Sequence, residues 1–383
     1  MKKIILSLLR FISLFFPKNN NKIVFRSFPD YSGNAMAIYE YLKDKDKDKD
    51  KDKDKDKDKD KDKLIWLTDN KYNKSNMRSV KLYTLTGLFN FFTAKYIITT
   101  HNELVSLTIK NQKYISLWHG MPLKKIGYLG MEYKKMKPMS AQRIATSELT
   151  RAIIAASFNE PANNVYITGQ PVCDKLITPR NIANYFTIPS DIKKVVFYLP
   201  TFRQDFNETK IEGRVIHRDN IFRLDEFSHY EFIRNIKEKG IFLIVKLHPA
   251  EEYLLNNLEL NENIVFVKSK DIDLYDVLSG CDALITDYSS VYIDYLVTDK
   301  PIAFIIPDKD EYILNRGGFT LEPFDEWTPG NKIKKVEEIY DFFDMLINEK
   351  DEFKSERHRV KKILHKYSDG NNSKRVADIL IRD

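Results

Sequence analysis

The chain has 383 residues, of which 43% are hydrophobic, and its formal net charge is +7. This length exceeds what one core usually supports, so two domains are expected. The mild positive charge, without a Lys/Arg run outside one repeat, excludes a dedicated nucleic-acid binder. Cys173 and Cys281 lie far apart without His or Cys at ligand spacing, which favours a reducing, cytoplasmic protein over a disulfide or zinc framework.

Residues 1–20 predict an amphipathic helix. The apolar stretch Ile4–Phe16 is too short to span a bilayer, and no small-residue cleavage site follows it. Lys3, Ser7 and Arg10 fall on one side of the helix, a pattern typical of a helix that lies in the membrane interface. A helix packed on the protein's own core is the alternative.

Residues 43–63 are a strict Lys-Asp alternation with a net charge of +1. The alternation places like charges four residues apart and offers no apolar residue for packing. Disorder is therefore expected, and the repeat is interpreted as an expanded linker.

Short apolar runs alternate with helical patterns in two successive blocks, residues 21–185 and residues 190–383, joined by a connection at 181–191. In the first block the expected strands are Lys22–Phe25, Leu64–Leu67, Tyr96–Thr100, Lys113–Trp118, Ile144–Ser147 and Val165–Thr168. In the second they are Val195–Leu199, Phe242–Leu247, Ile264–Val267, Ala283–Ile285 and Ile302–Ile306, followed by helices from about residue 335. This alternation indicates an α/β protein with two Rossmann-like parallel sheets.

Polar residues directly follow several of these strands: His119, Gly169, Arg203, His248 and Asp287. Ligands of open parallel sheets bind outside the carboxyl ends of the strands. We therefore expect these residues to line a cleft between two facing domains, a common place for substrates.

The segment Thr286-Asp287-Tyr288-Ser289-Ser290 separates a buried strand from an amphipathic run. Its hydroxyls stand where a helix begins and backbone N–H groups lack partners, a place that suits a phosphate. A serine helix cap without a ligand is the alternative.

Two histidines follow strands and suit acid–base or phosphate chemistry. His119 precedes Gly120, which lets the backbone turn and present the imidazole as a general base. His248 lies two residues after Lys246, so both side chains should point to one face of a strand. For either histidine, a structural role is the alternative.

Arg203 offers a planar fork for phosphate oxygens, unless it pairs with Asp205 or Glu208. Asp174 could position a ligand hydroxyl or cap a helix.

The sequence lacks the motifs of several other enzyme classes. It has no G-x-G-x-x-G after the first strand, no P-loop and no Gly-x-Ser-x-Gly. No cluster has metal-ligand spacing, so no cofactor is expected, although a divalent ion held by Asp287 and Asp294 with a diphosphate stays open.

Taken together, the motifs resemble the CDP-glycerol glycerophosphotransferase family, the teichoic-acid primases and polymerases with a GT-B fold. The matching segments include WHGMPLKKIG (118–127), GQPVCDKL (169–176), YLPTFR (198–203), KLHP (246–249), the stretch from Leu274 to Tyr312 and RGGF (316–319). Gln170 and Val172 depart from the Gly-Tyr-Pro-Arg form associated with the family.

The resemblance implies transfer of a polyol phosphate from a CDP-activated donor to a hydroxyl of a lipid-linked or polymeric glycan, with release of CMP. It implies that His119 and His248 are essential and that Thr286, Ser289 and Ser290 hold the donor pyrophosphate. Arg203, Lys246 and Asp287 are assigned to the donor side, and Asp174 and Lys124 to the acceptor side. The expected location is the cytoplasmic face of the membrane.

Some questions stay open at this point. The sequence does not decide between glycerol and ribitol or name the acceptor. A GT-B glycosyltransferase that uses a nucleotide sugar and a non-catalytic membrane-associated scaffold are the competing functions.

Overall fold

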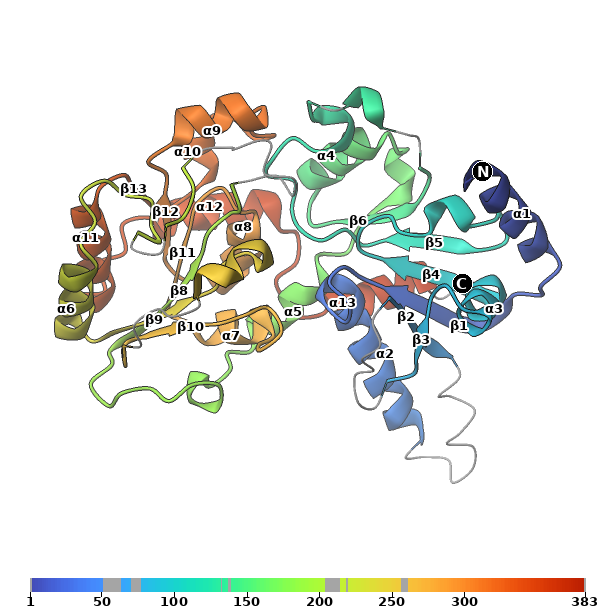
Figure 1. Cartoon of the computed structure of the whole chain (residues 1–383), viewed down its shortest axis with the longest axis horizontal. Coiled ribbons are helices and arrows are strands. Elements are labelled where there is room, and N and C mark those ends of the chain that lie inside the picture. Colours follow the sequence, from blue (N-terminus) through green and yellow to red (C-terminus); the bar gives the residue numbers. More distant parts are fainter. Residues whose placement is uncertain are drawn as a thin grey trace. The chain divides into compact units, whose positions relative to one another are not determined.

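The computed structural model describes residues 2–50, 63–69, 77–131, 133–136, 139–203, 214–217, 220–255 and 261–381. The chain forms two compact units (Figure 1). The first unit comprises Met1–Gly120, Lys134–Asp174 and Lys366–Asp383, and the second comprises Met121–Tyr133 and Lys175–His365.

These units correct the expected domain boundaries. The chain passes into the second unit after Asp174, before the expected connection at 181–191. The segment that follows His119 and Gly120 also belongs to the second unit, and the last residues return to the first. Sequence periodicity predicts elements but not which core each element joins, because that choice depends on contacts between distant parts of the chain.

Among the residues described, the first unit contains a seven-stranded parallel sheet in the order β3-β2-β1-β4-β5-β6-β7. Its strands are β1 (Asn19–Arg26), β2 (Leu64–Thr68), β3 (Ser79–Lys81), β4 (Ala94–Thr99), β5 (Lys113–Ser116), β6 (Gln142–Ala145) and β7 (Val165–Ile167). The predicted strands of this unit are confirmed. Sequence analysis missed β3, a short edge strand without a fully buried residue, which gives little hydrophobic signal.

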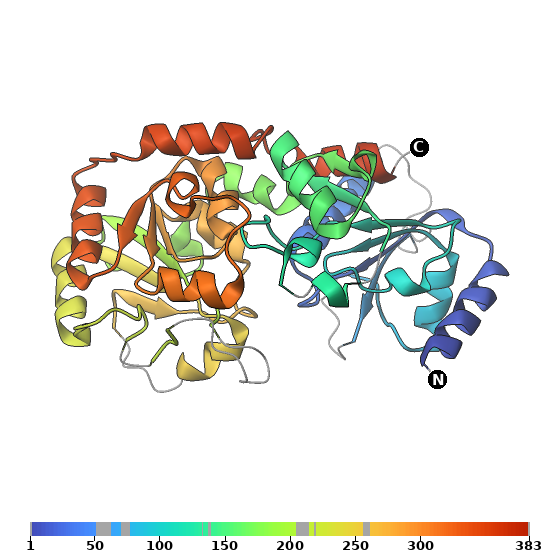
Figure 2. The same cartoon turned by 90° about the horizontal axis from the view of Figure 1, so that it is seen from above.

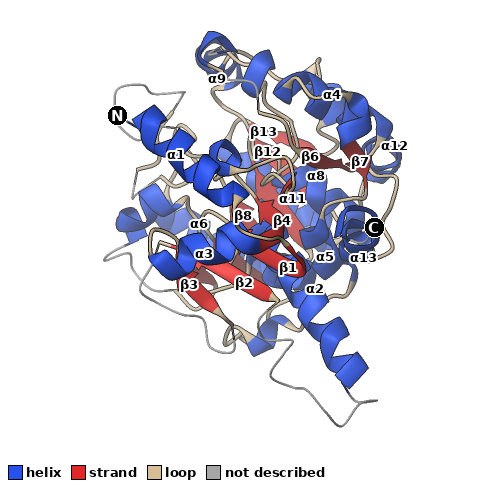
Figure 3. Cartoon of the chain, turned by 90° about the vertical axis from the view of Figure 1, so that its right-hand side faces the viewer, coloured by secondary structure: helices blue, strands red, loops and turns tan. Residues whose placement is uncertain are grey.

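Alternate residues of the first sheet face two separate cores. Ile23 and Phe25 of β1 join one cluster, and Val24 joins the other. Helices α2 (Gly33–Asp50) and α13 (Asn372–Val376) cover the first face, whereas α1 (Lys2–Leu14) and α3 (Leu85–Thr93) cover the second (Figure 3). A sheet covered on both faces accounts for the continuous apolar runs in the sequence.

Helix α2 extends further than the sequence predicted. It continues through the first part of the Lys-Asp repeat, Lys43 to Asp50, where disorder was expected. An alternation of period two also places opposite charges three residues apart, which supports a helix that tertiary packing has already started. Residues 51–62 of the repeat lie outside the described residues.

The described part of the second unit forms a six-stranded parallel sheet in the order β10-β9-β8-β11-β12-β13. Its strands are β8 (Lys194–Leu199), β9 (Ile241–Val245), β10 (Ile264–Phe266), β11 (Ala283–Thr286), β12 (Ile302–Ile305) and β13 (Asn331–Ile333). The five predicted strands are confirmed, and β13 is a further short edge strand. The chain therefore has the two parallel-sheet α/β domains that the sequence predicted.

Helices cover both faces of this second sheet. The helices between residues 174 and 364 are α5 (Asp174–Ile177), α6 (His229–Lys239), α7 (Leu274–Gly280), α8 (Val291–Tyr295), α9 (Lys309–Arg316), α10 (Phe324–Trp327), α11 (Val336–Ile347) and α12 (Lys354–Leu364). The remaining helix, α4 (Glu148–Phe158), belongs to the first unit. Figure 2 shows α6 and α11 side by side. Phe232 of α6 and Phe343 of α11 belong to one buried cluster with residues of the strands. The predicted helical C-terminal region is confirmed.

Helix α1 combines the two alternatives that the sequence left open. Leu6 and Leu9 pack against the core of the first unit. On another side of the helix, Ile4, Leu8 and Phe11 are 74%, 56% and 58% exposed. The helix is therefore docked on the protein and still presents an apolar face to its surroundings.

Candidate active site

The residues singled out in the sequence lie beyond the carboxyl ends of strands and are divided between the two units. His119 and Asp174 belong to the first unit, whereas the other candidates belong to the second. Each sheet has a point where the strand order reverses, between β1 and β4 in the first and between β8 and β11 in the second. Such switch points are where open parallel sheets bind their ligands.

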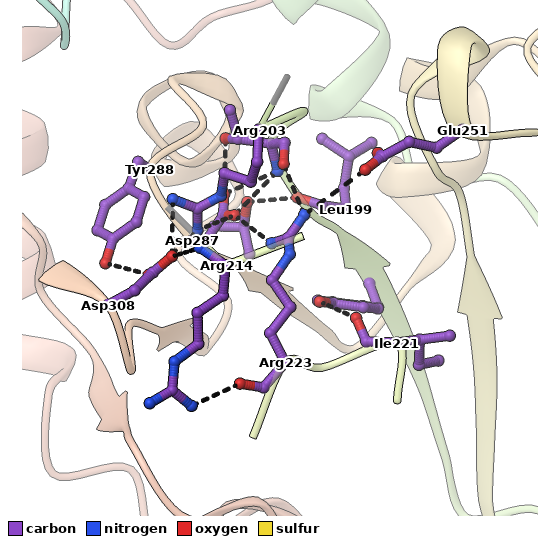
Figure 4. Close-up of polar contacts among 12 residues, drawn as sticks. Leu199, Arg203, Arg214, Ile221, Arg223, Glu251, Asp287, Tyr288 and Asp308 are labelled. Atoms are coloured by element: carbon purple, nitrogen blue, oxygen red, sulfur yellow. Dashed lines mark hydrogen bonds and ion pairs between the residues drawn. The ribbon is translucent and has the colours of Figure 1, made fainter. Parts of the chain in front are cut away.

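A buried charge network centred on Asp287 occupies the switch point of the second unit (Figure 4). The carboxylate accepts hydrogen bonds from the backbone N–H of Thr201 at 2.9 Å and from its hydroxyl at 2.6 Å. Its Oδ2 also pairs with Arg203 at 3.0 Å and with Arg223 at 3.1 Å. Burial opposes ionisation of Asp287, but the two arginines outweigh it and hold the pKa of the carboxyl below its ordinary value. Asp287 thereby ties the turn after β8 to the turn after β11.

Arg203 is an internal member of this network. Its side chain is 0% exposed and its Nη1 also lies 3.4 Å from a carboxylate oxygen of Asp308. The guanidinium carbon lies 4.5 Å from the ring centre of Tyr288 and 4.6 Å from that of Tyr312. Acidic and aromatic side chains from distant segments therefore surround the fork, and its contact with a ligand phosphate stays a prediction. The alternative partners, Asp205 and Glu208, lie outside the described residues.

The hydroxyl cluster after β11 separates into inward and outward members. Thr286 is fully buried and its hydroxyl donates to the carbonyl of Leu199 at 2.6 Å, so it holds two strand ends together. Ser289 and Ser290 are half-buried, and the hydroxyl of Ser289 accepts from the N–H of Val291 at 3.4 Å. Thr286 and Asp287 thus shape the turn, which leaves the two serines as the candidates for contact with a ligand.

Lys246 and His248 follow β9 at the strand edge of the second unit. The Nζ of Lys246 donates to the hydroxyl of Ser269 at 2.8 Å, and the ring of His248 stacks on Phe202 with centroids 4.7 Å apart. Desolvation and the charge of Lys246 lower the pKa of His248. The two side chains are therefore electrostatically coupled, and a shared face of the strand stays a prediction.

Lys124 lies in the second unit, not on the acceptor side of the first unit as expected. It pairs with Phe319 through an isolated antiparallel bridge, next to a hydrogen bond from the N–H of Thr320 to the carbonyl of Leu123 at 2.8 Å. Its charge contributes to the lowered pKa of His248. Lys124 therefore adds to the positive potential around His248.

His119 follows β5 in the first unit and is exposed. Its Nδ1 lies 3.2 Å from the carbonyl oxygen of Thr100. A carbonyl oxygen only accepts hydrogen bonds, so Nδ1 carries the proton, and Nε2 of the neutral ring has the free lone pair. The ring also stacks on His101, with centroids 3.9 Å apart and planes 3° apart. Desolvation by this packing lowers the pKa of His119, which favours the neutral, basic form.

Asp174 serves as a helix cap. Its carboxylate accepts hydrogen bonds at 2.8 Å from the backbone N–H groups of Asn372 and Ser373, at the start of α13. Gly169, whose φ is +81°, lies so close to Asn372 that an added Cβ would stand 2.2 Å from its amide oxygen. The expected acceptor contact of Asp174 is therefore corrected in favour of the capping alternative, because its carboxylate and the preceding turn hold the returning C-terminal segment.

Comparison of the sequence with known protein families identifies the family of the chain. A model of the family described as CDP-Glycerol:Poly(glycerophosphate) glycerophosphotransferase matches residues 8–382. The chain belongs to this family. The resemblance predicted from the strand-end motifs is confirmed.

Known members of the glycerophosphotransferase family resemble the chain over most of its length. The teichoic acid poly(glycerol phosphate) polymerase of Bacillus spizizenii is 27% identical over 351 residues, which cover 84% of this chain and 83% of that protein. The teichoic acid glycerol-phosphate transferase of Staphylococcus aureus is 26% identical over 395 residues, with coverages of 95% and 94%. The structure of the wall teichoic acid polymerase TagF superposes with a TM-score of 0.74 at 21% identity and covers 99% of this chain and 94% of that one.

These relationships decide between the competing functions. Family membership supports a CDP-glycerol glycerophosphotransferase of teichoic-acid synthesis, as the sequence predicted, and not a nucleotide-sugar glycosyltransferase. The likeness to TagF establishes the two-domain GT-B-like fold of the family.

The carboxylates that the sequence left open for a divalent ion already have protein partners. Asp287 pairs with two arginines, and Asp294 accepts a hydrogen bond from the hydroxyl of Tyr275 at 2.7 Å. Across the described ranges, no group of three or more His, Cys, Asp or Glu side chains could hold a metal ion.

Sequence reasoning did not assign several residues that complete these sites. Arg223, Asp308 and Glu251 surround Asp287 and Arg203. Arg223 comes from a loop that no strand pattern marked, whereas Asp308 follows the expected strand Ile302–Ile306 and Glu251 follows the KLHP motif. His101 was more accessible to prediction, because it follows the expected strand Tyr96–Thr100 just as His119 follows the next strand.

Proposed function

We propose that the two units divide the transfer of glycerol phosphate between a base in the first unit and a cationic donor-phosphate site in the second. The donor is CDP-glycerol, and the acceptor is a hydroxyl of a polymeric or lipid-linked glycerol phosphate chain. The acceptor oxygen forms a bond to the phosphorus that carries glycerol, the bond from that phosphorus to the bridging oxygen breaks, and CMP leaves.

The observation that carries this proposal is the tautomer of His119. Because Nδ1 donates to the carbonyl of Thr100, Nε2 of the neutral ring is the acceptor for the proton of the attacking hydroxyl. Its lowered pKa keeps the ring neutral at the pH of the cytoplasm. No hydrogen-bond partner of Nε2 is found among the described residues, which fits an atom that awaits a substrate.

In the second unit, Lys246 and Lys124 supply positive charge, the neutral ring of His248 can supply an N–H donor, and Ser289 and Ser290 supply hydroxyl donors. A phosphoryl transfer needs stabilisation of the charge on the phosphate oxygens more than it needs covalent chemistry. The network of Asp287, Arg203 and Arg223 is buried, and it fixes the turn from which the serines project.

The release of CMP tests this function directly. The full-length protein is incubated with CDP-glycerol or CDP-ribitol and with a prenol-linked glycerol phosphate acceptor, and CMP is quantified by chromatography. We expect turnover of CDP-glycerol, with a decrease of about 10²- to 10⁴-fold in the His119→Gln variant. His229→Gln, a substitution at the first residue of α6 that removes a histidine without an assigned role, is the matched control.

Two outcomes would contradict the proposal. Full activity of His119→Gln would remove the assigned base. Absence of turnover with both donors, under conditions where the protein is folded, would favour the non-catalytic scaffold.

We further propose that the exposed face of α1 attaches the protein to the inner surface of the cell membrane. Ile4, Leu8 and Phe11 recur at helical spacing, and Phe15, which follows the helix, is 72% exposed. Phe89 of α3 contacts Phe16, is 51% exposed and extends the apolar surface.

The chemistry of this surface suits the interface of an anionic bilayer. Arg10 is exposed on α1, and the Nζ of Lys22 lies 5.3 Å from the ring centre of Phe89. Apolar insertion and basic charge together are typical of helices that lie on a membrane. Within the part of the chain that the structure describes, no helix is long and apolar enough to cross a bilayer.

Co-sedimentation with vesicles tests the attachment. We expect the protein to bind vesicles that contain phosphatidylglycerol more tightly than neutral phosphatidylcholine vesicles. The double variant Leu8→Ser/Phe11→Ser should bind about tenfold or more weakly, because each buried apolar side chain contributes about 1.5–3 kcal/mol. A matched control replaces exposed Leu314 of α9 by Ser. Unchanged binding of the double variant would contradict the proposal.

A further inference from the structure

We infer that His101 is a positioning residue for His119, whose ring it stacks against so that Nε2 is held in one orientation toward the acceptor hydroxyl. This inference rests on the proposed role of His119 as the base. It assigns a function to a side chain that the transfer reaction does not itself require.

The sheet brings the two histidines together. Strands β4 and β5 are parallel neighbours in which Thr99 pairs with Ser116, so the turns that follow them leave the same edge side by side. Trp118 adopts a φ of +57°, an unusual conformation for a residue other than glycine. This local bend places His119, one residue further from its strand end than His101, in register with the His101 ring.

His101 is itself held by several contacts, as a positioning residue must be. Its Nδ1 lies 2.9 Å from the hydroxyl of Thr100, and its backbone N–H donates to Glu103 at 2.7 Å. The rings of Phe28 and His101 form a T-shaped contact with centroids 5.8 Å apart. Phe28 comes from the turn after β1, so both sides of the switch point fix the histidine stack.

The backbone next to His119 is also held by a buried side chain. The buried amide of Asn34 donates to the carbonyl of Trp118 at 3.2 Å and accepts from the N–H of Val172 at 3.1 Å. One hydrogen bond, from Nδ1 to the carbonyl of Thr100, does not fix the plane of the His119 ring. The parallel ring of His101 fixes that plane. Backbone, hydrogen bond and stack thus each fix a different part of the same residue.

The stack also affects where protons reside. Two imidazolium rings at this separation would repel each other strongly in a partly desolvated site, so the pair carries at most one proton near neutral pH. Desolvation and the charge of His119 lower the pKa of His101 to about 4. His101 therefore stays neutral near neutral pH, and it acts by covering one face of the His119 ring.

The other charged groups of this edge lie around His101. Glu103 accepts from its backbone, and burial raises the pKa of that carboxyl. Arg26 and Asp30, at and after the end of β1, act on Glu103 with opposite signs. Glu103, Arg26 and Asp30 are unchanged in every His101 variant. A change in the pKa of His119 between variants therefore reports the loss of the stacked ring.

Two substitutions separate stacking from other roles of His101. His101→Ala removes the ring, whereas His101→Phe keeps an aromatic face and cannot titrate. NMR titration of the His119 ring in the unliganded protein should show a pKa about 0.5–1 unit higher in His101→Ala and a value close to wild type in His101→Phe. The acidic limb of the kcat profile should move in the same direction, with kcat about tenfold lower in His101→Ala and less than about threefold lower in His101→Phe.

Several outcomes would overturn the inference. The pKa of His119 could be unchanged in His101→Ala, or kcat could fall equally in both variants without a shift of the pH profile, which would indicate that His101 contacts the substrate itself. If His101→Ala does not fold, as judged by circular dichroism, His101→Asn replaces it in the same comparison, because an amide can still bond to Thr100. The NMR result needs no substrate, so it stands apart from the proposed function, which the His119→Gln assay tests.

Discussion

The two sheets have the same parallel design, yet their switch points hold opposite kinds of chemistry. In the first unit, neutral aromatic rings meet there: His119 stacks on His101, and Phe28 packs against the pair. In the second unit, full charges meet, with Asp287 held between Arg203 and Arg223. One edge is built to accept a proton, and the other is built to hold a rigid turn beside cationic side chains.

The difference shows how burial decides the role of a polar residue. His119 is exposed and its Nε2 has no hydrogen-bond partner among the described residues, whereas Arg203 is completely buried and lies between the carboxylates of Asp287 and Asp308. Both follow a strand directly, so the position along the chain is the same for both. Only the surrounding side chains distinguish a residue that meets the substrate from one that maintains the site.

The largest expected effects come from replacing the histidine of each edge. His119→Gln and His248→Gln should each lower kcat by about 10²- to 10⁴-fold. Their donor binding should differ, because only His248 lies beside Lys246 in the proposed donor-phosphate site. Calorimetry should show CDP-glycerol affinity retained in His119→Gln and weakened about tenfold or more in His248→Gln. Equal loss of donor affinity in both variants would contradict the division of roles.

Replacement of Arg203 should destabilise the second unit. Arg203→Leu leaves the carboxylates of Asp287 and Asp308 buried without their shared cation, which should lower the free energy of unfolding by about 3–5 kcal/mol. Arg234→Leu, which removes an exposed i,i+4 pair with Glu238, should change it by less than about 0.5 kcal/mol. Urea unfolding measures both, and similar midpoints for the two variants would rule out a structural role for the buried network.

Glu251 should make the stability of the second unit depend on pH. Burial, larger than the opposing effect of Arg223, raises its pKa from 4.5 to about 7 in the folded state. The folded protein then binds this proton more tightly than the unfolded chain, so its stabilising contribution is complete below pH 4.5 and is lost as the pH rises through about 7.

Glu251→Gln removes this titration. The variant should gain about 2–3 kcal/mol relative to wild type between pH 5 and pH 8, as followed by urea unfolding at several pH values. Comparison with wild type cancels the titration of all other groups. A constant difference across this range would show that Glu251 does not titrate there.

The smallest expected effect lies at the neutral edge. Asn34→Leu removes the buried amide that contacts the carbonyl of Trp118, which should cost about 1–3 kcal/mol of stability. Because the lost hydrogen bond joins an uncharged amide and an uncharged carbonyl, the cost should be insensitive to salt between 0.05 and 0.5 M. A thermal unfolding series checks both statements, and a strong salt dependence of the cost would contradict this account of the Asn34 contact.

The sequence by itself determined the fold class, the parallel strands of both sheets and the placement of His119 and His248 after strands. It could do so because buried parallel strands leave continuous apolar runs, and because polar residues after such runs must lie at one edge of the sheet. The two short edge strands, β3 and β13, escaped because partial burial and small size weaken that signal.

Only the tertiary structure decided what each strand-end residue does. It turned Arg203, Thr286 and Asp287 inward, assigned Asp174 to the start of α13 and moved Lys124 into the second unit. It also stacked His101 on His119 and brought Arg223 to Asp287 from a loop without a pattern. The physical reason is that burial and partner choice depend on residues distant in the chain, whereas local periodicity reports only which face of an element is apolar.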